Sequence, residues 1–312
     1  MMAKTPKEER LIILSGDARR KYSARILFEV ERSSYIGEID QVTMLLETGK
    51  NVTLTRRKEG LAGEINALYF IDIEGFSTAA EAEHAGMVTA QSVLFAAVSL
   101  NFGVRLLYES HEPPSIRDRT SSKEGGIHLG ATLTSYGGCS GEAITSELIE
   151  AMKHEMRDRR TILALELYTS ASFEYNSRAR FLAAVSAFEP LAFQEDLGPE
   201  VATFVLKVCK DLDLDSSIPK ELLPSLKGRI LQLRKESVRQ SLLRLCSKWF
   251  PGDLQARNSI ESAYQLRSEI LHEGRLTDLD VDLDKEYKTA ASHLRRIFEL
   301  EFQRQLTVPS VV

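Results

Sequence analysis

The chain has 312 residues, of which 43% are hydrophobic and 27% are charged, and its formal net charge is -5. This composition excludes a disordered or fibrous protein, and the acidic balance excludes a bulk attraction for nucleic acid or anionic membranes, so any such affinity must be local. The length gives room for two domains, each with its own hydrophobic core.

Cysteine usage and hydropathy indicate the compartment. The three cysteines, Cys139, Cys209 and Cys246, lie far apart and form no C-x-x-C pair, so neither a disulfide framework nor a zinc site is expected. Residues 1–10 are charged and lack the apolar stretch of a signal peptide. No run approaches the roughly eighteen apolar residues of a membrane span. We therefore expect a soluble, cytoplasmic protein that does not contact a membrane.

Residues 1–140 combine strand and helix patterns, which predicts an α+β domain. Four segments have the alternation or composition of strands: Tyr22–Val30, Val52–Arg56, Ala67–Ile73 and Val104–Tyr108. A long, largely buried helix is predicted over Ala79–Leu100, with Thr78 and Glu81 as a capping box. Strand, helix and strand then form a βαβ-like unit. The Gly- and Pro-rich segment from His111 to Gly141 predicts a loop, with a short strand near Ile127–Thr134 as an option.

From Thr145 onward the hydrophobic period is that of helices. Eight helices are predicted: Thr145–Arg157, Arg160–Phe173, Arg178–Phe193, Glu200–Asp211, Leu222–Arg234, Ser237–Phe250, Asp253–His272 and Asp282–Arg304. The boundary near Arg157 is open, because one longer helix through Met156 fits the pattern as well. The expected fold is an α+β domain over residues 1–140 followed by an all-helical domain over residues 141–312.

One stretch near the C-terminal end, from Tyr264 to Gly274, combines a helical pattern with reactive side chains. Its far end carries Arg267, a permanent cation, and His272, whose side chain titrates near neutral pH. Gly274 would end the helix.

The spacing Arg-x4-His on a helix of a helical domain resembles the ribonuclease motif of the HEPN family. With Tyr264 and Ser268 beside Arg267, the stretch is most similar to the ApeA-type branch of that family. The segment from Arg180 to Leu191 also looks like the family's early core helix, which carries an acidic residue, here Glu189. The resemblance spans about residues 160–304 and leaves the N-terminal half uncovered. That half could be a sensor, a substrate-recognition module or a partner-binding surface.

The resemblance implies an HEPN-like helical bundle that dimerises and cleaves RNA without a metal or cofactor, leaving a cyclic phosphate end. Stress response or phage defence is the setting that the family suggests. In this chemistry His272 would exchange a proton with the attacking 2′-OH or the leaving oxygen, and Arg267 would stabilise the developing negative charge. Ser268 can donate a hydrogen bond to phosphate, and Glu189 either pairs with Arg267 or lies exposed.

The two side chains cannot project from one face of a regular helix, because five positions turn through about 500° and leave them roughly 140° apart. They converge through fraying at Leu271–Gly274, through the reach of Arg267, or across a two-fold axis between two copies. The two-fold arrangement fits this geometry best. The alternative is a binding or scaffolding module, in which His272 interacts with the helix dipole and Arg267 forms a structural salt bridge.

A basic stretch precedes this helix, with seven cations and one acid between Lys227 and Lys248. Its candidate RNA-contacting residues are Arg234, Lys235, Arg239 and Arg244. A solvated face on helices with an apolar opposite side explains the pattern equally well. Two acidic runs, one of them starting at Asp211, lack the glycine and glutamate of a calcium loop, so no metal site is predicted.

Overall fold

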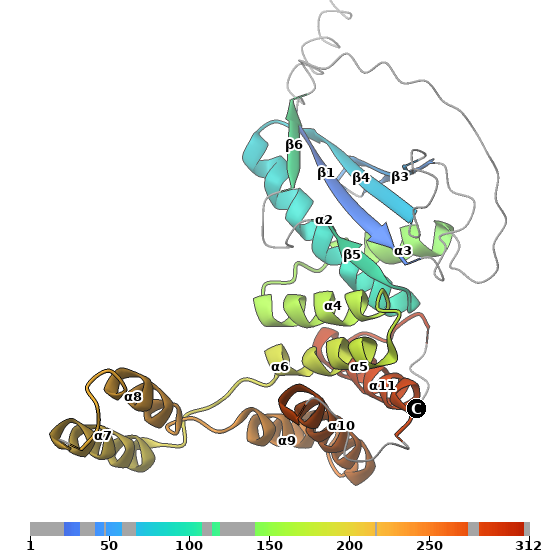
Figure 1. Ribbon diagram of the computed structural model, residues 1–312. Coiled ribbons are helices and arrows are strands. Elements are labelled where there is room, and N and C mark those ends of the chain that lie inside the picture. Colours follow the sequence, from blue (N-terminus) through green and yellow to red (C-terminus); the bar gives the residue numbers. More distant parts are fainter. Residues whose placement is uncertain are drawn as a thin grey trace, which may run out of the picture.

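The structure is a computed structural model that describes residues 22–31, 41–46, 48–57, 67–107, 114–118, 141–215, 217–273 and 281–308. An antiparallel sheet occupies the N-terminal half, and helices make up the C-terminal half (Figure 1). The predicted α+β class is confirmed. Within the described ranges, no helix is long and apolar enough to cross a membrane.

The sheet is built around its first strand. Its strands are β1 (Tyr22–Val30), β2 (Gln41–Leu45), β3 (Asn51–Arg56), β4 (Ala67–Phe76), β5 (Val104–Leu106) and β6 (Ser115–Asp118). Strand β1 pairs with β4 on one side and with β5 and β6 on the other, and every pair is antiparallel. Strands β3 and β2 continue the sheet beyond β4.

The predicted alternation of β1 is confirmed. Ile26, Phe28 and Val30 are fully buried and face the hydrophobic core. On the opposite face Arg25 donates two hydrogen bonds of 2.6 Å to the carboxylate of Asp72 on β4. Because successive strand residues point to opposite faces, one face of the sheet is apolar and the other carries this ion pair.

Helix α2 (Ala79–Leu100) covers the apolar face and is buried along most of its length, as predicted. The hydroxyl of Thr78 accepts a hydrogen bond from the backbone N–H of Glu81 at 3.2 Å, so the predicted N-cap is confirmed. The Glu81 carboxylate, however, accepts from the N–H of Ser77 and not from that of Thr78. Strands β4 and β5 flank β1 and run parallel to each other, so β4, α2 and β5 form the expected βαβ-like unit with β1 between the two strands.

Several strand predictions need correction. Strands β2 and β6 are absent from the sequence-based expectation, and β6 lies in the segment predicted as a loop. Strand β4 continues through Gly75 to Phe76, and β5 ends at Leu106. The optional strand at 127–134 and the helix stop at Gly274 lie outside the described residues. Strand β2 lies at the edge of the sheet, and Met44 is its one buried residue. Its five residues therefore give too weak a pattern of buried apolar residues to predict a strand.

The helices of the C-terminal half are α3 (Gly141–Met152), α4 (Arg159–Ala171), α5 (Ser177–Ser186), α6 (Phe188–Leu191), α7 (Pro199–Leu214), α8 (Leu223–Gln232), α9 (Val238–Trp249), α10 (Leu254–Glu273) and α11 (Leu283–Phe302). The predicted helix Arg178–Phe193 is two helices, because α5 ends at Ser186 and α6 begins at Phe188, with Ala187 as a turn residue between them. Helix α3 starts earlier than the predicted Thr145–Arg157 and ends at Met152, so both the predicted end at Arg157 and the longer helix through Met156 are wrong.

The sheet and the helices share one hydrophobic core. Helix α2 packs on the sheet and also against α3 and α4, so Ile144 and Leu148 of α3 join the same buried cluster as the strands. Helices α5, α10 and α11 pack on one another below α4, and α9 packs on α10 (Figure 1). The predicted boundary at residue 140 therefore falls before a helix whose core is continuous with the sheet.

Helices α7 and α8 form a hairpin that extends away from the rest of the molecule (Figure 1). They pack on each other through the buried Val205 and Cys209 of α7. Phe204, Leu214 and Leu222 are exposed on this hairpin. The apolar faces of the two helices therefore stabilise the hairpin itself, and their residues are not part of the central hydrophobic core.

Gly103, just after α2, allows the sheet half to approach α4 closely. A Cβ atom at this position would lie 1.9 Å from Ser172 Oγ and 2.9 Å from Ser172 Cβ. We expect Gly103→Ala to lower the free energy of unfolding by about 1–3 kcal/mol, because the two halves must separate or distort. The matched control is Gly228→Ala in α8, where no atom lies within 4 Å. This control should raise the free energy of unfolding by up to roughly 1 kcal/mol, because alanine has a higher helix propensity than glycine. Denaturant midpoints of the wild type and of the two variants measure both effects.

Candidate functional site

Arg267 lies on α10 and forms an ion pair with Glu189 of the short helix α6, with 2.9 Å between Nη2 and Oε1. The Arg267 side chain is 18% exposed and that of Glu189 is 34% exposed. The Nε atom of Arg267 is buried and has no hydrogen-bond partner among the described residues. Of the two options for Glu189, the structure shows the one in which it pairs with Arg267.

Tyr264 lies one helical turn before Arg267 and contributes to the same cluster. The guanidinium carbon of Arg267 is 5.8 Å from the centre of the Tyr264 ring. Burial raises the pKa of the Tyr264 hydroxyl, the nearby Glu189 carboxylate raises it further, and Arg267 lowers it. Ser268 is half-buried on the same helix and makes no hydrogen bond through its hydroxyl to a described residue. Glu189, Tyr264 and Arg267 are thus brought together.

His272 is exposed in the last described turn of α10, and its imidazole makes no hydrogen bond or ion pair with any described residue. The helix stays regular through Glu273, so fraying is absent over 271–273, and Gly274 lies outside the described residues. No hydrogen bond or ring contact joins His272 to Arg267. Fraying, one of the three routes by which Arg267 and His272 could converge, is therefore absent from the described part of the last turn. The reach of Arg267 and the two-fold arrangement stay open.

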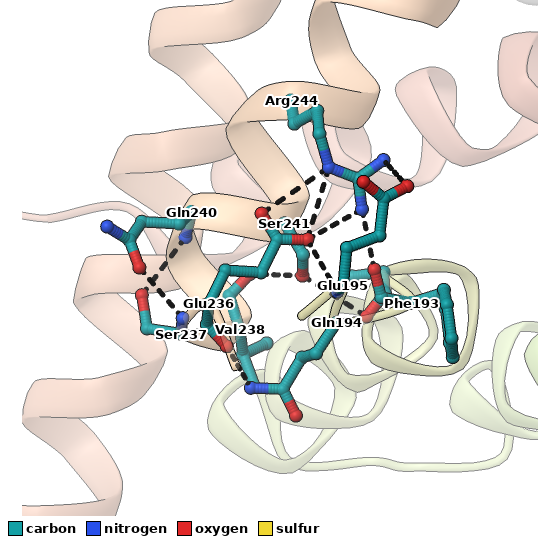
Figure 2. Close-up of polar contacts among 10 residues, drawn as sticks. Phe193, Gln194, Glu195, Glu236, Ser237, Val238, Gln240, Ser241 and Arg244 are labelled. Atoms are coloured by element: carbon teal, nitrogen blue, oxygen red, sulfur yellow. Dashed lines mark hydrogen bonds and ion pairs between the residues drawn. The ribbon is translucent and has the colours of Figure 1, made fainter. Parts of the chain in front are cut away.

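Two of the four candidate RNA-contacting residues are engaged in ion pairs within the chain. Arg239 on α9 pairs with Glu261 on α10. Arg244, one turn and a half further on, donates from Nη2 to an oxygen of Glu236 at 2.6 Å and to the backbone carbonyl of Phe193 at 2.7 Å (Figure 2). It also pairs with Glu195 at 3.0 Å. Arg244 therefore connects Glu236, which precedes α9, to the segment that follows α6.

Glu236 is the residue of this network that the sequence analysis left without a role. It is buried, and its Oε1 accepts from the backbone N–H of Glu195 at 3.0 Å as well as from Arg244. The hydrogen bonds from Arg244 hold the pKa of this carboxyl below its ordinary value. A signal was present in the sequence, because Glu236 is the one acid in a stretch of seven cations.

Arg234 and Lys235 lie between α8 and α9, at the base of the hairpin. The backbone carbonyl of Arg234 accepts from the N–H of Leu197 at 2.8 Å, and Lys235 forms an isolated β-bridge with Asp196. Lys235 is exposed, and no described residue forms an ion pair with it. Arg234 is half-buried and also forms no ion pair with a described residue, so these two candidates keep uncompensated charges and Lys235 is the more exposed of them.

The described residues contain no group of three or more His, Cys, Asp or Glu side chains placed to hold a metal ion. A comparison of the chain with protein-family models, with curated proteins and with solved structures found no match.

Proposed function

We propose that the chain is a metal-independent ribonuclease of the HEPN type, with a site that joins Arg267 of one copy to His272 of a second copy. The observation that supports this best is the different state of the two side chains on α10. Arg267 is held in place by Glu189, whereas His272 is exposed and has no partner among the described residues. A fixed cation and an uncommitted imidazole match the two roles that phosphodiester cleavage requires.

In the proposed reaction the 2′-oxygen of RNA forms a bond to the adjacent phosphorus while the bond to the 5′-oxygen breaks. His272 takes the proton of the 2′-hydroxyl or gives a proton to the leaving 5′-oxygen, and water exchanges the other proton, so that a cyclic phosphate and a 5′-hydroxyl result. Arg267 stabilises the added negative charge of the phosphorane through its remaining donors. Glu189 uses one Nη2 contact and limits the rotation of the guanidinium, so it acts as a positioning residue.

A second candidate function is a non-cleaving HEPN-type module that binds nucleic acid or protein. The observation that favours it is the same ion pair, because Glu189 offsets the charge of Arg267 in a half-buried position. In this alternative the pair joins α6 to α10 as a structural contact, and His272 is a surface residue.

Mixing two inactive variants tests the shared site. Arg267→Ala and His272→Ala chains are each expected to be inactive, and co-expression should restore cleavage, because a mixed dimer combines the intact Arg267 of one chain with the intact His272 of the other. Cleavage of a labelled RNA by each variant and by the mixture is the measurement. The control mixture pairs wild-type chains with an Arg267→Ala, His272→Ala double variant.

Two outcomes would contradict the shared site. If the single variants are inactive and the mixture is inactive as well, both residues act within one copy. If light scattering shows a monomer at micromolar concentration while wild-type cleavage persists, no second copy is needed. A wild-type chain that cleaves no RNA favours the non-cleaving module.

A further inference from the structure

Two adjoining cavities are lined by residues from the C-terminal end of α2 and from α4, α5 and α11. Their volumes are about 450 Å³ and about 500 Å³, which is the size range of small-molecule sites. They share three wall residues: Asn101, Tyr168 and Tyr287. Since Asn101 caps α2 and the two tyrosines come from α4 and α11, both halves of the chain line this space.

The larger cavity contains a buried cation, Arg295 of α11, which is 4% exposed. Its guanidinium donates to the backbone carbonyls of Val98 and Val308, and to the side-chain oxygen of Asn101 at 3.3 Å. No carboxylate among the described residues pairs with it. The carbonyl of Val98 belongs to the negative end of α2, which offsets part of the charge. Because no carboxylate neutralises the rest of this charge, the cavity is electropositive, and an anion bound there would reduce the cost of burying the cation.

Lys285 and Lys288 add two more positive charges to the same cavity. Both side chains are exposed, and neither forms an ion pair with a described residue. The lining of this cavity includes no aspartate or glutamate. Three cations around one space are suited to an anion with several acceptor oxygens, and a phosphate group has that chemistry.

The smaller cavity has a different lining, which includes polar uncharged groups, one acid and one arginine. Thr169 of α4 and Ser172, the C-cap of that helix, line it together with Glu31, which follows β1. Arg180 also lines it, but lies 3.8 Å from Asp284, and its Nε donates to the backbone carbonyl of Glu174. A carboxylate beside hydroxyl groups repels an anion and accepts hydrogen bonds from hydroxyls. This side is therefore suited to a neutral, hydroxylated body.

We propose that the joined cavities bind a small phosphorylated metabolite with a hydroxylated body, such as a nucleotide or a sugar phosphate. The phosphate lies beside Arg295, Lys285 and Lys288, and the body extends toward Thr169, Ser172 and Glu31. The Tyr287 ring forms a wall of both spaces and contacts the body. Because the walls come from the sheet half and the helical half, bound ligand holds the two halves together.

The test uses the full chain and four probes: adenosine monophosphate, glucose 6-phosphate, inorganic phosphate and citrate. At a concentration about a hundredfold above the dissociation constant, one of the two phosphorylated metabolites should raise the melting temperature by roughly 4 °C. Comparing these two identifies the body that is preferred. Inorganic phosphate and citrate should shift the melting temperature far less, because they lack the hydroxylated body or the phosphate.

A Lys285→Ser, Lys288→Ser double variant should bind the preferred metabolite at least tenfold more weakly by calorimetry. Its own melting temperature should stay unchanged, because both side chains are exposed. The charge-matched control is Lys207→Ser, Lys210→Ser on α7, which should bind as the wild type does. Three results would overturn the proposal: no shift with either metabolite, equal affinity for inorganic phosphate, or equal binding by the two double variants.

Discussion

A His272→Ala chain is expected to cleave RNA about 10²–10⁴ times more slowly than the wild type, which is the usual contribution of a positioned proton-transfer group. Its melting temperature should stay within a few degrees of the wild-type value. The reason is that His272 is exposed at the end of α10 and contacts no described side chain through a hydrogen bond or ion pair. Single-turnover rates on one labelled RNA, with melting curves of the same preparations, measure both effects.

The matched control for this prediction is Asn258→Ala, which removes another exposed side chain from the same helix. It should retain the full rate and the wild-type melting temperature. Full cleavage by His272→Ala would place the chemistry at another site. A slow His272→Ala variant with an equally slow control would indicate damage to α10 instead of loss of a proton carrier.

Arg267→Ala is expected to lose nearly all of the cleavage rate, and Arg267→Lys most of it, with RNA binding reduced less than turnover in both variants. A guanidinium forms planar, paired hydrogen bonds to phosphate, which an ammonium at the end of a flexible chain cannot reproduce. The transition state carries more negative charge than the substrate, so the missing donors matter most there. Melting temperature, RNA affinity and single-turnover rate on the same three proteins measure this pattern.

The ion pair with Glu189 makes the structural alternative testable in the same experiment. If Arg267 only joins α10 to α6, Lys should preserve the pair and most of the activity, while Ala should cost roughly 1 kcal/mol of stability, as for other partly exposed pairs. Glu189→Gln is the control, because it breaks the ion pair and keeps the guanidinium. A destabilised Ala variant beside a functional Lys variant would contradict the catalytic role.

The sequence predicted the fold best where one element's own pattern decides its structure. The alternation of Tyr22–Val30 and the cap at Thr78 depend on neighbouring residues, and both are confirmed. Strand β2 exists because β3 offers it backbone partners, which its own residues do not encode. The break between α5 and α6 at Ala187 has no glycine beside it that would predict it.

In the candidate site, too, the sequence predicted the local element and not the contacts between elements. The helix that carries Arg267 and His272 was predicted from its apolar spacing, and α10 covers that stretch through Glu273. The ion pair between Glu189 and Arg267 joins residues from separate helices, so the sequence offered it only as one of two options. The role of Arg244 in holding Glu236 and Glu195 likewise depends on the folded path of the chain, in which the base of the hairpin returns to α6.

The measurement that tests the central claim most directly is incubation of the wild-type chain with total RNA in excess EDTA, followed by analysis of the new ends. The proposed Arg267 and His272 chemistry predicts cleavage that persists in EDTA and leaves cyclic phosphate and 5′-hydroxyl ends, because the 2′-oxygen is the attacking group. Absence of cleavage, or cleavage that EDTA abolishes and that leaves 3′-hydroxyl ends, would contradict it.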